Sequence, residues 1–267
     1  WGSTTASIIS RNCETILWAR NKKIVDQINT KHRNNRYLGD ANLHAKLKAT
    51  YSIEEAVMGA QAVLVAVPSN HFRNVLSEAV QTLPTDIPVI SLSKGLETGT
   101  RLRMTEIIRQ VAPGRIPGVL TGPNLAREII EGQAAASVLA LEDNGVALML
   151  QRFLNAGRFR VYTNSDVIGC ELGGVLKNII AIAVGMGDGL GVGDNTRAAL
   201  ITRGLAEMSR LGTSLGGKAE TFAGLAGMGD MIATCTSPQS RNRHVGIELA
   251  RGRHIDDIIT SMHMVAE

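Results

Sequence analysis

The stretch Ala62–Val67 has the sequence AVLVAV and is followed at once by Pro68. A short continuous apolar run that stops at a proline is typical of a strand buried on both faces, as in a parallel sheet. Similar short runs occur elsewhere in the first 163 residues, namely Thr15–Trp18, Val89–Leu92, Gly118–Leu120 and Ser137–Leu139. Amphipathic helical segments lie between these runs, for example Lys23–Thr30 and Met104–Val111. This alternation of strands and helices predicts a doubly wound parallel sheet.

The strand signal disappears from Asn164 onward, and helical periods dominate to the end of the chain. We therefore expect a Rossmann-type α/β domain over residues 1–163, which would bind a dinucleotide, and an all-α substrate domain over residues 164–267. Both ends look cut. The chain opens with Trp1 rather than Met and enters a helical stretch with no strand before it, and it stops at Glu267 without a turn or cap.

The composition narrows the class of protein. Hydrophobic residues make up 44% and charged residues 19% of the 267 residues, the balance of a soluble globular protein. Aromatic residues are only 3%, so the core must be built from Val, Ile, Leu, Ala and Met, which favours α/β and helical packing over an aromatic-rich sandwich. The net charge is +4 with the Lys and Arg residues scattered, which indicates no nucleic-acid partner.

The cysteines and the apolar runs indicate the compartment. Cys13, Cys170 and Cys235 are far apart and lack metal-ligand spacing, so we expect free thiols in a reducing compartment and no metal site. No apolar run approaches the roughly 20 residues that a membrane span needs, so we expect no membrane insertion.

The N-terminal half holds one partial cofactor signal. Dinucleotide-binding turns place glycines before a helix, and only Gly2 could be the last glycine of such a turn. After the Thr15–Trp18 strand, NAD enzymes usually carry an acid, but here Arg20 follows and the nearest downstream acid is Asp26. Lys22 and Lys23 open the next helix, where cations are disfavoured unless an anionic ligand is near; a solvated basic turn is the alternative. We expect NADP to be accepted, alongside NAD.

Two loops follow predicted strands at their carboxyl ends, where ligands bind in open α/β sheets. In Ser91–Glu97, Lys94 comes directly after a buried strand and beside a glycine, so it can reach into the crevice. In Thr121–Ala126, Asn124 is a plausible helix N-cap, and capping is the simpler interpretation of that residue taken alone.

In the segment Gly169–Val184, Lys177 and Asn178 have apolar residues on every side of the expected helix around them, so we expect both to be largely buried. A buried ammonium is costly unless it is paired, and burial lowers a lysine pKa toward the range useful for proton transfer. Gly173 and Gly174 lie on the same face one turn earlier; glycines in mid-helix cost about 1 kcal/mol each and make sense if something approaches the backbone closely. The alternative is a lysine that extends past apolar neighbours to the surface.

Polar groups gather again after a glycine-rich turn. Asp230 ends the sequence LAGMGD, where its carboxylate could face a cleft and pair with a lysine. Ser240, Arg241 and Asn242 then offer a hydroxyl, a guanidinium and an amide in succession, a combination that suits a phosphate. An ordinary surface loop is the alternative interpretation.

These segments, taken in order, resemble the bacterial, cytoplasmic NAD(P)-dependent glycerol-3-phosphate dehydrogenase family over essentially the whole chain. The matching segments are WGSTTAS, LSKGLE, GPNLAREI, ELGGVLKNIIAIAVGMGDGLG with GDNTRAALITRGL, LAGMGDMIATCTS and SRNRHVG. The resemblance implies reversible hydride transfer between NAD(P)H and dihydroxyacetone phosphate, giving sn-glycerol 3-phosphate for glycerophospholipid synthesis. It also implies a cytoplasmic homodimer whose partner is a small phosphorylated substrate.

The resemblance assigns roles to individual residues. Lys177 would be the general acid or base, oriented by Asp230, and Lys94 would stabilise the developing oxyanion. Substrate contacts would come from Lys94, Gly122, Asn124, Lys177, Asp230, Ser240, Arg241 and Asn242. Cofactor contacts would come from Trp1, Arg20, Lys94, Ala126, Arg241, Val265 and Glu267. The family's first strand, its first two fingerprint glycines and its terminal helices are expected to be missing here, so the neighbours of that strand would lose a ladder partner.

Two other functions stay open. A related hydroxyacid-type dehydrogenase also uses a helix-borne lysine, but it has less need of the phosphate-binding run that follows Ser240. A non-catalytic dinucleotide-binding sensor would be expected to have lost Lys177 or Lys94, and both are present.

Overall fold

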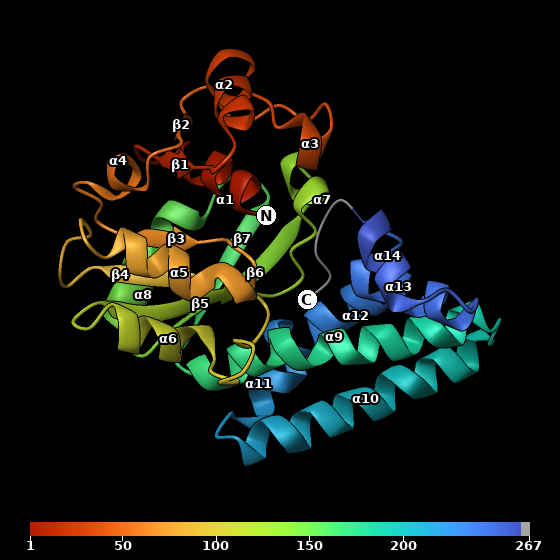
Figure 1. The fold of residues 1–267 in the computed structure, drawn as a ribbon. Helices are drawn as coiled ribbons and strands as arrows, with labels where there is room; N and C mark the ends of the chain where they lie inside the picture. The colour runs from red at the N-terminus through yellow and green to blue at the C-terminus, as the bar shows by residue number, and fades with distance from the viewer. Residues whose placement is uncertain (263–267) are drawn as a thin grey trace. The chain divides into compact units, whose positions relative to one another are not determined.

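The computed structural model describes residues 1–262, which form two compact units. The sheet unit comprises Trp1–Leu120 with Asn124–Ser165, and the helical unit comprises Thr121–Pro123 with the residues from Asp166 onward. All the strands of the described chain precede Asp166, and only helices follow it (Figure 1).

The strands of the described residues form two sheets. The first is the parallel pair β1 (Ile16–Trp18) and β2 (Lys48–Thr50). The second has the order β3 (Val63–Val65), β4 (Pro88–Ser91), β5 (Ile116–Thr121), β6 (Ala135–Leu141) and β7 (Phe159–Asn164). In it β3 pairs with β4, β4 with β5 and β6 with β7 in parallel, which confirms the predicted parallel α/β fold. The strands β1 and β3 belong to different sheets of the described residues and are not paired with each other.

Helices cover both faces of the five-stranded sheet. Residues of α1 (Gly2–Ile9) and α8 (Asn144–Leu154) share one apolar core with the sheet. Residues of α5 (Ser69–Ala79) and α6 (Met104–Val111) share another. Val89 belongs to the second core and its neighbour Ile90 to the first, because successive side chains of a strand point to opposite faces. The unit is therefore doubly wound, as predicted.

The remaining helices of the sheet unit are short or belong to the two-stranded sheet. They are α2 (Lys22–Lys31), α3 (Asn35–Leu38), α4 (Ile53–Val57) and α7 (Ala126–Ile130). A third core holds α2 and α3 against β2 through residues such as Ile28, Leu38 and Ala49. This core supports the loop that follows β1.

Three details of the sheet differ from the sequence prediction. The strands β2 and β7 were not predicted, because β2 is only Lys-Ala-Thr and β7 alternates buried and exposed residues instead of forming an apolar run. In β3, Val63 and Leu64 are only half-buried, so burial on both faces was wrong. The reason is that β3 lies at the edge of its sheet, where one neighbour is lacking.

The helical unit is built around its longest helix, α9 (Val167–Gly189). The others are α10 (Asp194–Ser214), α11 (Ala219–Ala223), the π-helix η1 (Leu225–Gly229), α12 (Asp230–Thr236), α13 (Arg241–Ala250) and α14 (Ile255–Ser261). Helices α10, α12 and α13 pack on α9. A Cβ atom on Gly185 would lie 2.1 Å from Arg243 O, and one on Gly246 would lie 2.1 Å from Ile182 O. Glycine at both positions therefore lets the backbones of α9 and α13 touch.

By length and composition alone, α9 could cross a membrane, with a mean hydropathy of 1.8 in its most apolar window. The prediction of no long apolar run missed it, because Glu171, Lys177 and Asn178 interrupt the apolar residues. Of that window, 61% is buried inside the protein, which is typical of the core helix of a globular domain.

Candidate active site

Lys177 lies on α9 and is buried, with only 4% of its surface exposed, so the alternative of a side chain that reaches the surface is wrong. Its Nζ donates hydrogen bonds to Asn178 Oδ1 at 2.9 Å and to Thr234 Oγ1 at 2.8 Å. Asp230 Oδ1 lies 3.5 Å from the same Nζ, so the expected pairing of Asp230 with a lysine is present. The ammonium is thus surrounded by oxygen acceptors in an otherwise apolar helix.

Asp230 and Thr234 reach Lys177 because of the local backbone. The glycine-rich segment before Asp230 forms the π-helix η1, a conformation that often marks functional sites, and α12 begins at Asp230 itself. Thr234 follows one turn later and donates from Oγ1 to Asp230 O at 2.6 Å, so its lone pairs are free to accept from Lys177. A Cβ atom on Gly173 would lie 2.5 Å from Ala226 O, so the close approach predicted there is made by η1.

Two members of this cluster were not assigned a role from the sequence. Asn178 was expected to be buried and is 93% buried, but its function as an acceptor for Lys177 was not predicted. Thr234 follows Asp230 by four residues on the same helix, and that spacing was the available signal. We call Lys177, Asn178, Asp230 and Thr234 the lysine cluster.

Ser240, Arg241 and Asn242 lie at the start of α13, so the surface-loop alternative is wrong. Ser240 is the N-cap, and its Oγ accepts from Arg243 N at 3.2 Å. Ser240 and Asn242 are buried, whereas Arg241 is exposed. A helix N-terminus favours anions, because its first N–H groups lack acceptors within the helix. The run therefore combines a cation, an amide and the positive end of a helix.

Arg243, the next residue, fastens α13 to two other helices. Its Nε and Nη2 donate to Asp188 Oδ2 at 2.7 Å each, and Arg197 Nε donates to Asp188 Oδ1 at 2.7 Å. Burial raises the pKa of Asp188, but the hydrogen bonds and charges of the two arginines outweigh it and lower the pKa overall. Asp188 therefore stays ionised at neutral pH and holds α9, α10 and α13 together.

In the sheet unit, Lys94 lies in the loop after β4 and is half-buried. Gly122, which belongs to the helical unit, directly follows β5 with φ of 122°, a conformation that L side chains rarely adopt. Asn124 is not a helix N-cap, because α7 starts after Leu125, and Asn124 Oδ1 instead accepts from Ser137 Oγ. Asn124 Nδ2 is buried with no hydrogen-bond partner among residues 1–262, so this amide keeps a donor for another group.

Ala126, a predicted cofactor residue, is the first residue of α7. Its carbonyl oxygen accepts from Thr4 Oγ1 at 3.2 Å, which joins α7 to α1. The loop around Asn124 is therefore held next to the first helix of the sheet unit.

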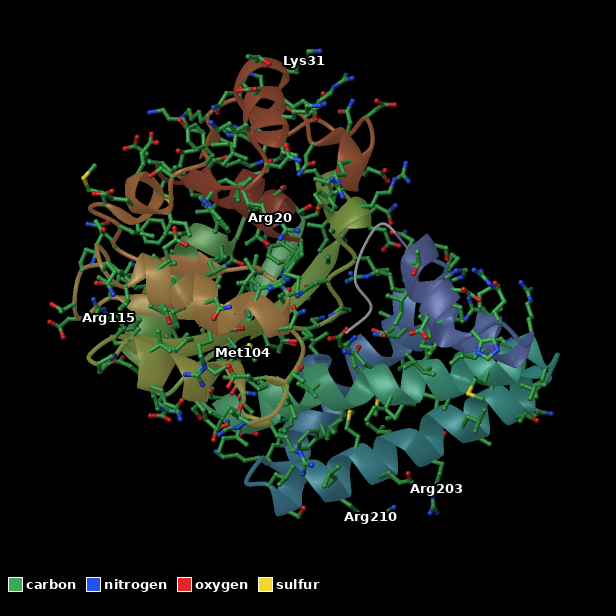
Figure 2. The ribbon with its side chains drawn as sticks, viewed as in Figure 1. Arg20, Lys31, Met104, Arg115, Arg203 and Arg210 are labelled. Atoms are coloured by element: carbon green, nitrogen blue, oxygen red, sulfur yellow. The ribbon has the colours of Figure 1, made fainter. Side chains whose placement is uncertain are left out.

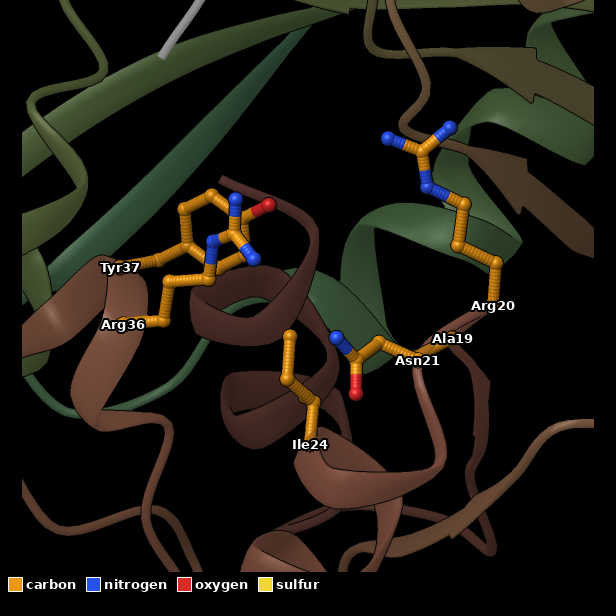
Figure 3. A pocket seen from close by; sticks show the side chains of 6 residues that line it. All are labelled: Ala19, Arg20, Asn21, Ile24, Arg36 and Tyr37. Carbon is orange, nitrogen blue, oxygen red and sulfur yellow. The ribbon is translucent and has the colours of Figure 1, made fainter. Parts of the chain in front are cut away.

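Arg20 follows β1 and lines a small pocket together with Arg36 and Tyr37 (Figure 3). The guanidinium of Arg36 lies 5.5 Å from the centre of the Tyr37 ring. Ala19, Asn21 and Ile24 complete the lining. The pocket thus has two guanidinium groups in its lining, one of them beside an aromatic ring, and guanidinium groups are suited to binding anions. The sequence did not indicate a binding role for Arg36 and Tyr37, because they lie on α3 and line the same pocket as Arg20 only in the folded chain.

The start of α1 has one feature of a dinucleotide-binding turn, a glycine packed closely on a strand. Gly2 is its first residue, and a Cβ atom there would lie 2.9 Å from the Cβ of Ala66, just past β3. Close packing of helix on strand is the role of the third fingerprint glycine. Trp1 is the N-cap and stacks edge-on against Phe159, with ring centres 6.1 Å apart. Two further predicted cofactor residues, Val265 and Glu267, lie outside the described residues.

A nearby anionic ligand is only part of the explanation for the lysines Lys22 and Lys23 at the start of α2. Lys22 Nζ lies 4.4 Å from the centre of the Tyr51 ring, so an aromatic partner accounts for its position. Elsewhere the cations are scattered along the chain: Lys31 lies on α2, Arg115 in the loop before β5 and Arg203 on α10 (Figure 2).

The buried thiols are poor nucleophiles. Burial raises the pKa of Cys170 to about 12 and that of Cys235 to about 11, and Cys13 is also a free thiol. Within residues 1–262 no group of three or more His, Cys, Asp or Glu side chains could hold a metal ion.

Comparison with known proteins gives matches over both units. The sequence model of the NAD-dependent glycerol-3-phosphate dehydrogenase N-terminus matches residues 1–147, and that of its C-terminus matches residues 166–267. A glycerol-3-phosphate dehydrogenase of Sphingopyxis alaskensis, named for NAD(P)+, is 61% identical over 267 residues, which cover 100% of this chain and 80% of that one. A relative of the same name from Mycobacterium avium is 53% identical over 268 residues, covering 100% and 79%. The crystal structure of glycerol-3-phosphate dehydrogenase from Coxiella burnetii has a TM-score of 0.94 at 37% identity, covering 100% and 82%.

Proposed function

Since the chain belongs to the NAD-dependent glycerol-3-phosphate dehydrogenase family, we propose that it interconverts dihydroxyacetone phosphate and sn-glycerol 3-phosphate with NAD(P)H. In the direction of reduction, ketone, NAD(P)H and one proton give alcohol and NAD(P)+. The observation that carries the proposal is the lysine cluster, because a buried ammonium with oriented acceptors is a proton donor for an alkoxide. Membership of the family and the cluster support the same reaction.

The proton chemistry falls to Lys177. As an ammonium it protonates the oxygen of the reacting carbonyl, and as a free amine it takes the hydroxyl proton in the reverse direction. Asp230 and Thr234 hold Nζ in one orientation and stabilise its charged form. Lys94 supplies a second positive charge for the developing oxyanion.

The phosphate of the substrate is held by the start of α13. Arg241 offers a guanidinium, Asn242 an amide, and the helix N-terminus its positive end. Binding a remote phosphate fixes the reacting carbonyl and lowers the entropic part of the barrier. Gly122 and Asn124 contribute further substrate contacts, the latter through the donor that Asn124 Nδ2 retains.

The residues of the sheet unit fit NADP as well as NAD. Arg20 and Arg36 would bind the 2′-phosphate, and the Tyr37 ring offers an apolar surface for the adenosine. Trp1 and the first turn of α1 would hold the pyrophosphate, with Ala126 nearby on α7. When bound, the reduced nicotinamide supplies the hydride for the ketone carbon.

The setting of the enzyme follows from the same family membership. We propose a cytoplasmic homodimer that supplies sn-glycerol 3-phosphate for glycerophospholipid synthesis. Three cysteines that are all free thiols support a reducing compartment.

The test is oxidation of NADPH and NADH by the intact enzyme with three substrates: dihydroxyacetone phosphate, dihydroxyacetone and a 2-keto acid. We expect rapid NAD(P)H oxidation with dihydroxyacetone phosphate and not with the other two substrates. Turnover of the keto acid without dihydroxyacetone phosphate would favour the hydroxyacid-type dehydrogenase. Cofactor binding with no oxidation on any substrate would favour the sensor and contradict the proposal.

A further inference from the structure

The loop that carries Lys94 is long and lacks regular structure. It runs over residues 92–103, between the end of β4 at Ser91 and the start of α6 at Met104. Connections of this length are usually mobile unless side chains fasten them, and a mobile loop cannot hold a charge in one place. The contacts that fasten this loop therefore determine how well Lys94 is positioned.

One anchor lies directly before Lys94. The hydroxyl of Ser93 donates to Val67 O at 2.6 Å, just past the end of β3. The backbone N–H of Leu92 donates to Val65 O at 2.9 Å, so the loop begins as a continuation of the β3–β4 ladder. The N-terminal side of Lys94 is therefore fixed by the sheet.

The other anchor lies three residues after Lys94. Arg73, on α5, donates from Nε to Glu97 Oε1 at 2.6 Å and from Nη2 to Glu97 Oε2 at 2.9 Å. This bidentate geometry is the strongest that a guanidinium and a carboxylate can adopt. The side chains are 32% and 15% exposed, so the pair is more shielded from water than an ordinary surface ion pair.

Glu97 also organises the rest of the loop. Its Oε2 accepts from Thr100 Oγ1 at 2.5 Å, and its backbone N–H donates to Leu102 O at 2.9 Å. Arg73 Nη2 donates in addition to Gln110 Oε1 on α6 at 2.9 Å. The guanidinium thus joins α5, α6 and the loop at one point. The hydrogen bonds from Arg73 and Thr100 lower the pKa of Glu97 to about 2, so the carboxylate is ionised at any working pH.

We propose that Arg73 and Glu97 are positioning residues for Lys94: their ion pair holds the loop at one end while Ser93 holds it at the other. The inference rests on the proposed function, because it assumes that Lys94 acts on the reaction. It assigns a purpose to an ion pair that the proposed function did not include among the substrate or cofactor residues. Misplacing a reacting group by about 1 Å can cost about 100-fold in rate, so a loosened loop has a measurable effect.

The first experiment compares two ion-pair deletions in the intact enzyme. Arg73→Met removes the guanidinium and keeps the apolar stem. Arg109→Met is the matched control, because Arg109 Nη2 lies 2.6 Å from Glu142 Oε1 in the same unit, and Glu142 lies outside the Lys94 loop. We expect Arg73→Met to lower kcat/KM for dihydroxyacetone phosphate by about 10- to 100-fold, and Arg109→Met to leave it within about 2-fold. Arg73→Lys, which keeps the charge, should recover part of the loss.

The second experiment separates positioning from general damage to the fold. If Arg73 acts through Lys94, then adding Arg73→Met to the Lys94→Ala variant should lower kcat/KM by less than about 3-fold. A purely structural role would lower the activity of Lys94→Ala by the same factor as that of the wild type. If Arg73→Met does not fold, Glu97→Gln keeps the size of the side chain and removes its charge, and it should show the same dependence on Lys94.

The outcomes distinguish the inference from the function beneath it. A wild type that does not oxidise NAD(P)H with dihydroxyacetone phosphate contradicts the proposed function. An active wild type with an impaired Lys94→Ala variant, together with an Arg73→Met variant equal to Arg109→Met, overturns the positioning role alone. The positioning role is also overturned if the fold losses in kcat/KM of Arg73→Met and Lys94→Ala multiply in the double variant.

Discussion

Replacing Asp230 by asparagine should destabilise the enzyme, because the change leaves a buried ammonium without its counter-charge. Lys177 and Asp230 are both almost fully buried, with 5% and 3% of their side chains exposed. In Asp230→Asn the ammonium keeps two neutral acceptors, Asn178 Oδ1 and Thr234 Oγ1. Neutral oxygens solvate a charge only in part, so a net cost of burial remains.

The size of that cost follows from the geometry. Removing one partner of a buried ion pair costs about 3–5 kcal/mol. Because the two neutral hydrogen bonds remain, we expect the lower end, about 3 kcal/mol. A chain of this size loses roughly 2–4 °C in Tm per kcal/mol, which gives a fall of roughly 6–12 °C. The matched control is Glu131→Gln, which breaks an exposed pair with Arg127 and should shift Tm by no more than about 2 °C.

Thermal unfolding at neutral pH measures the effect, and a double variant shows its cause. Lys177→Met with Asp230→Asn removes both charges of the pair, so no buried ammonium faces a neutral amide and most of the lost stability should return. The activity should not return, because the proton donor is gone. An Asp230→Asn variant that unfolds within about a degree of the wild type would show that Asp230 does not stabilise the buried ammonium, as would a double variant less stable than Asp230→Asn.

Three other predictions follow from the charged groups. Arg20→Asp should reduce the preference for NADPH over NADH by about 10-fold or more, because it replaces a partner of the 2′-phosphate with a repelling charge. Arg33→Asp, outside the pocket, should leave the preference unchanged. An unchanged ratio of the two kcat/KM values in Arg20→Asp would show that the 2′-phosphate binds elsewhere. Arg241→Gln removes a charge-assisted interaction with the substrate phosphate of about 1.5–3 kcal/mol. We therefore expect kcat/KM with dihydroxyacetone phosphate to fall by about 10- to 150-fold. An equal loss with dihydroxyacetone would show that Arg241 serves the cofactor or the fold. The pKa of Glu97 is lowered from 4.5 to about 2, so its contribution to stability is complete above about pH 4.5 and is lost as the pH falls toward 2. The difference in unfolding free energy between wild type and Arg73→Met, measured in urea, should therefore narrow over that range, and a difference that does not change with pH would contradict it.

The sequence predicted the strands that are apolar throughout and missed those that are not. The interior strand β4 is fully buried, so its run of apolar residues was visible. The helices predicted over Lys23–Thr30 and Met104–Val111 were placed almost to the residue. By contrast, β2 is three residues long and β7 exposes Arg160 and Tyr162, so neither forms an apolar run. Pairing with a neighbouring strand fixes such segments, and pairing is a property of the fold.

The candidate site was predicted where chemistry and local sequence coincide. Lys177 stood out because a lysine in an apolar helix needs a partner, and that partner is Asp230. Asn124 was interpreted as a cap from its position alone, but its amide turned to Ser137 on the neighbouring strand instead. Arg36 came from a separate short helix and could be found only once the chain was folded. Contacts between distant segments account for these differences.

In the proposed mechanism Lys177 provides the proton of the reaction. The direct test is the maximal rate of the Lys177→Met variant with saturating NADPH and dihydroxyacetone phosphate, together with its Kd for NADPH. Methionine preserves the bulk of the stem and removes the titrating group. We expect a rate about 10²–10⁴-fold below that of the wild type, with the Kd for NADPH hardly changed. A Lys177→Met variant that folds, binds NADPH and turns over at nearly the wild-type rate would contradict it.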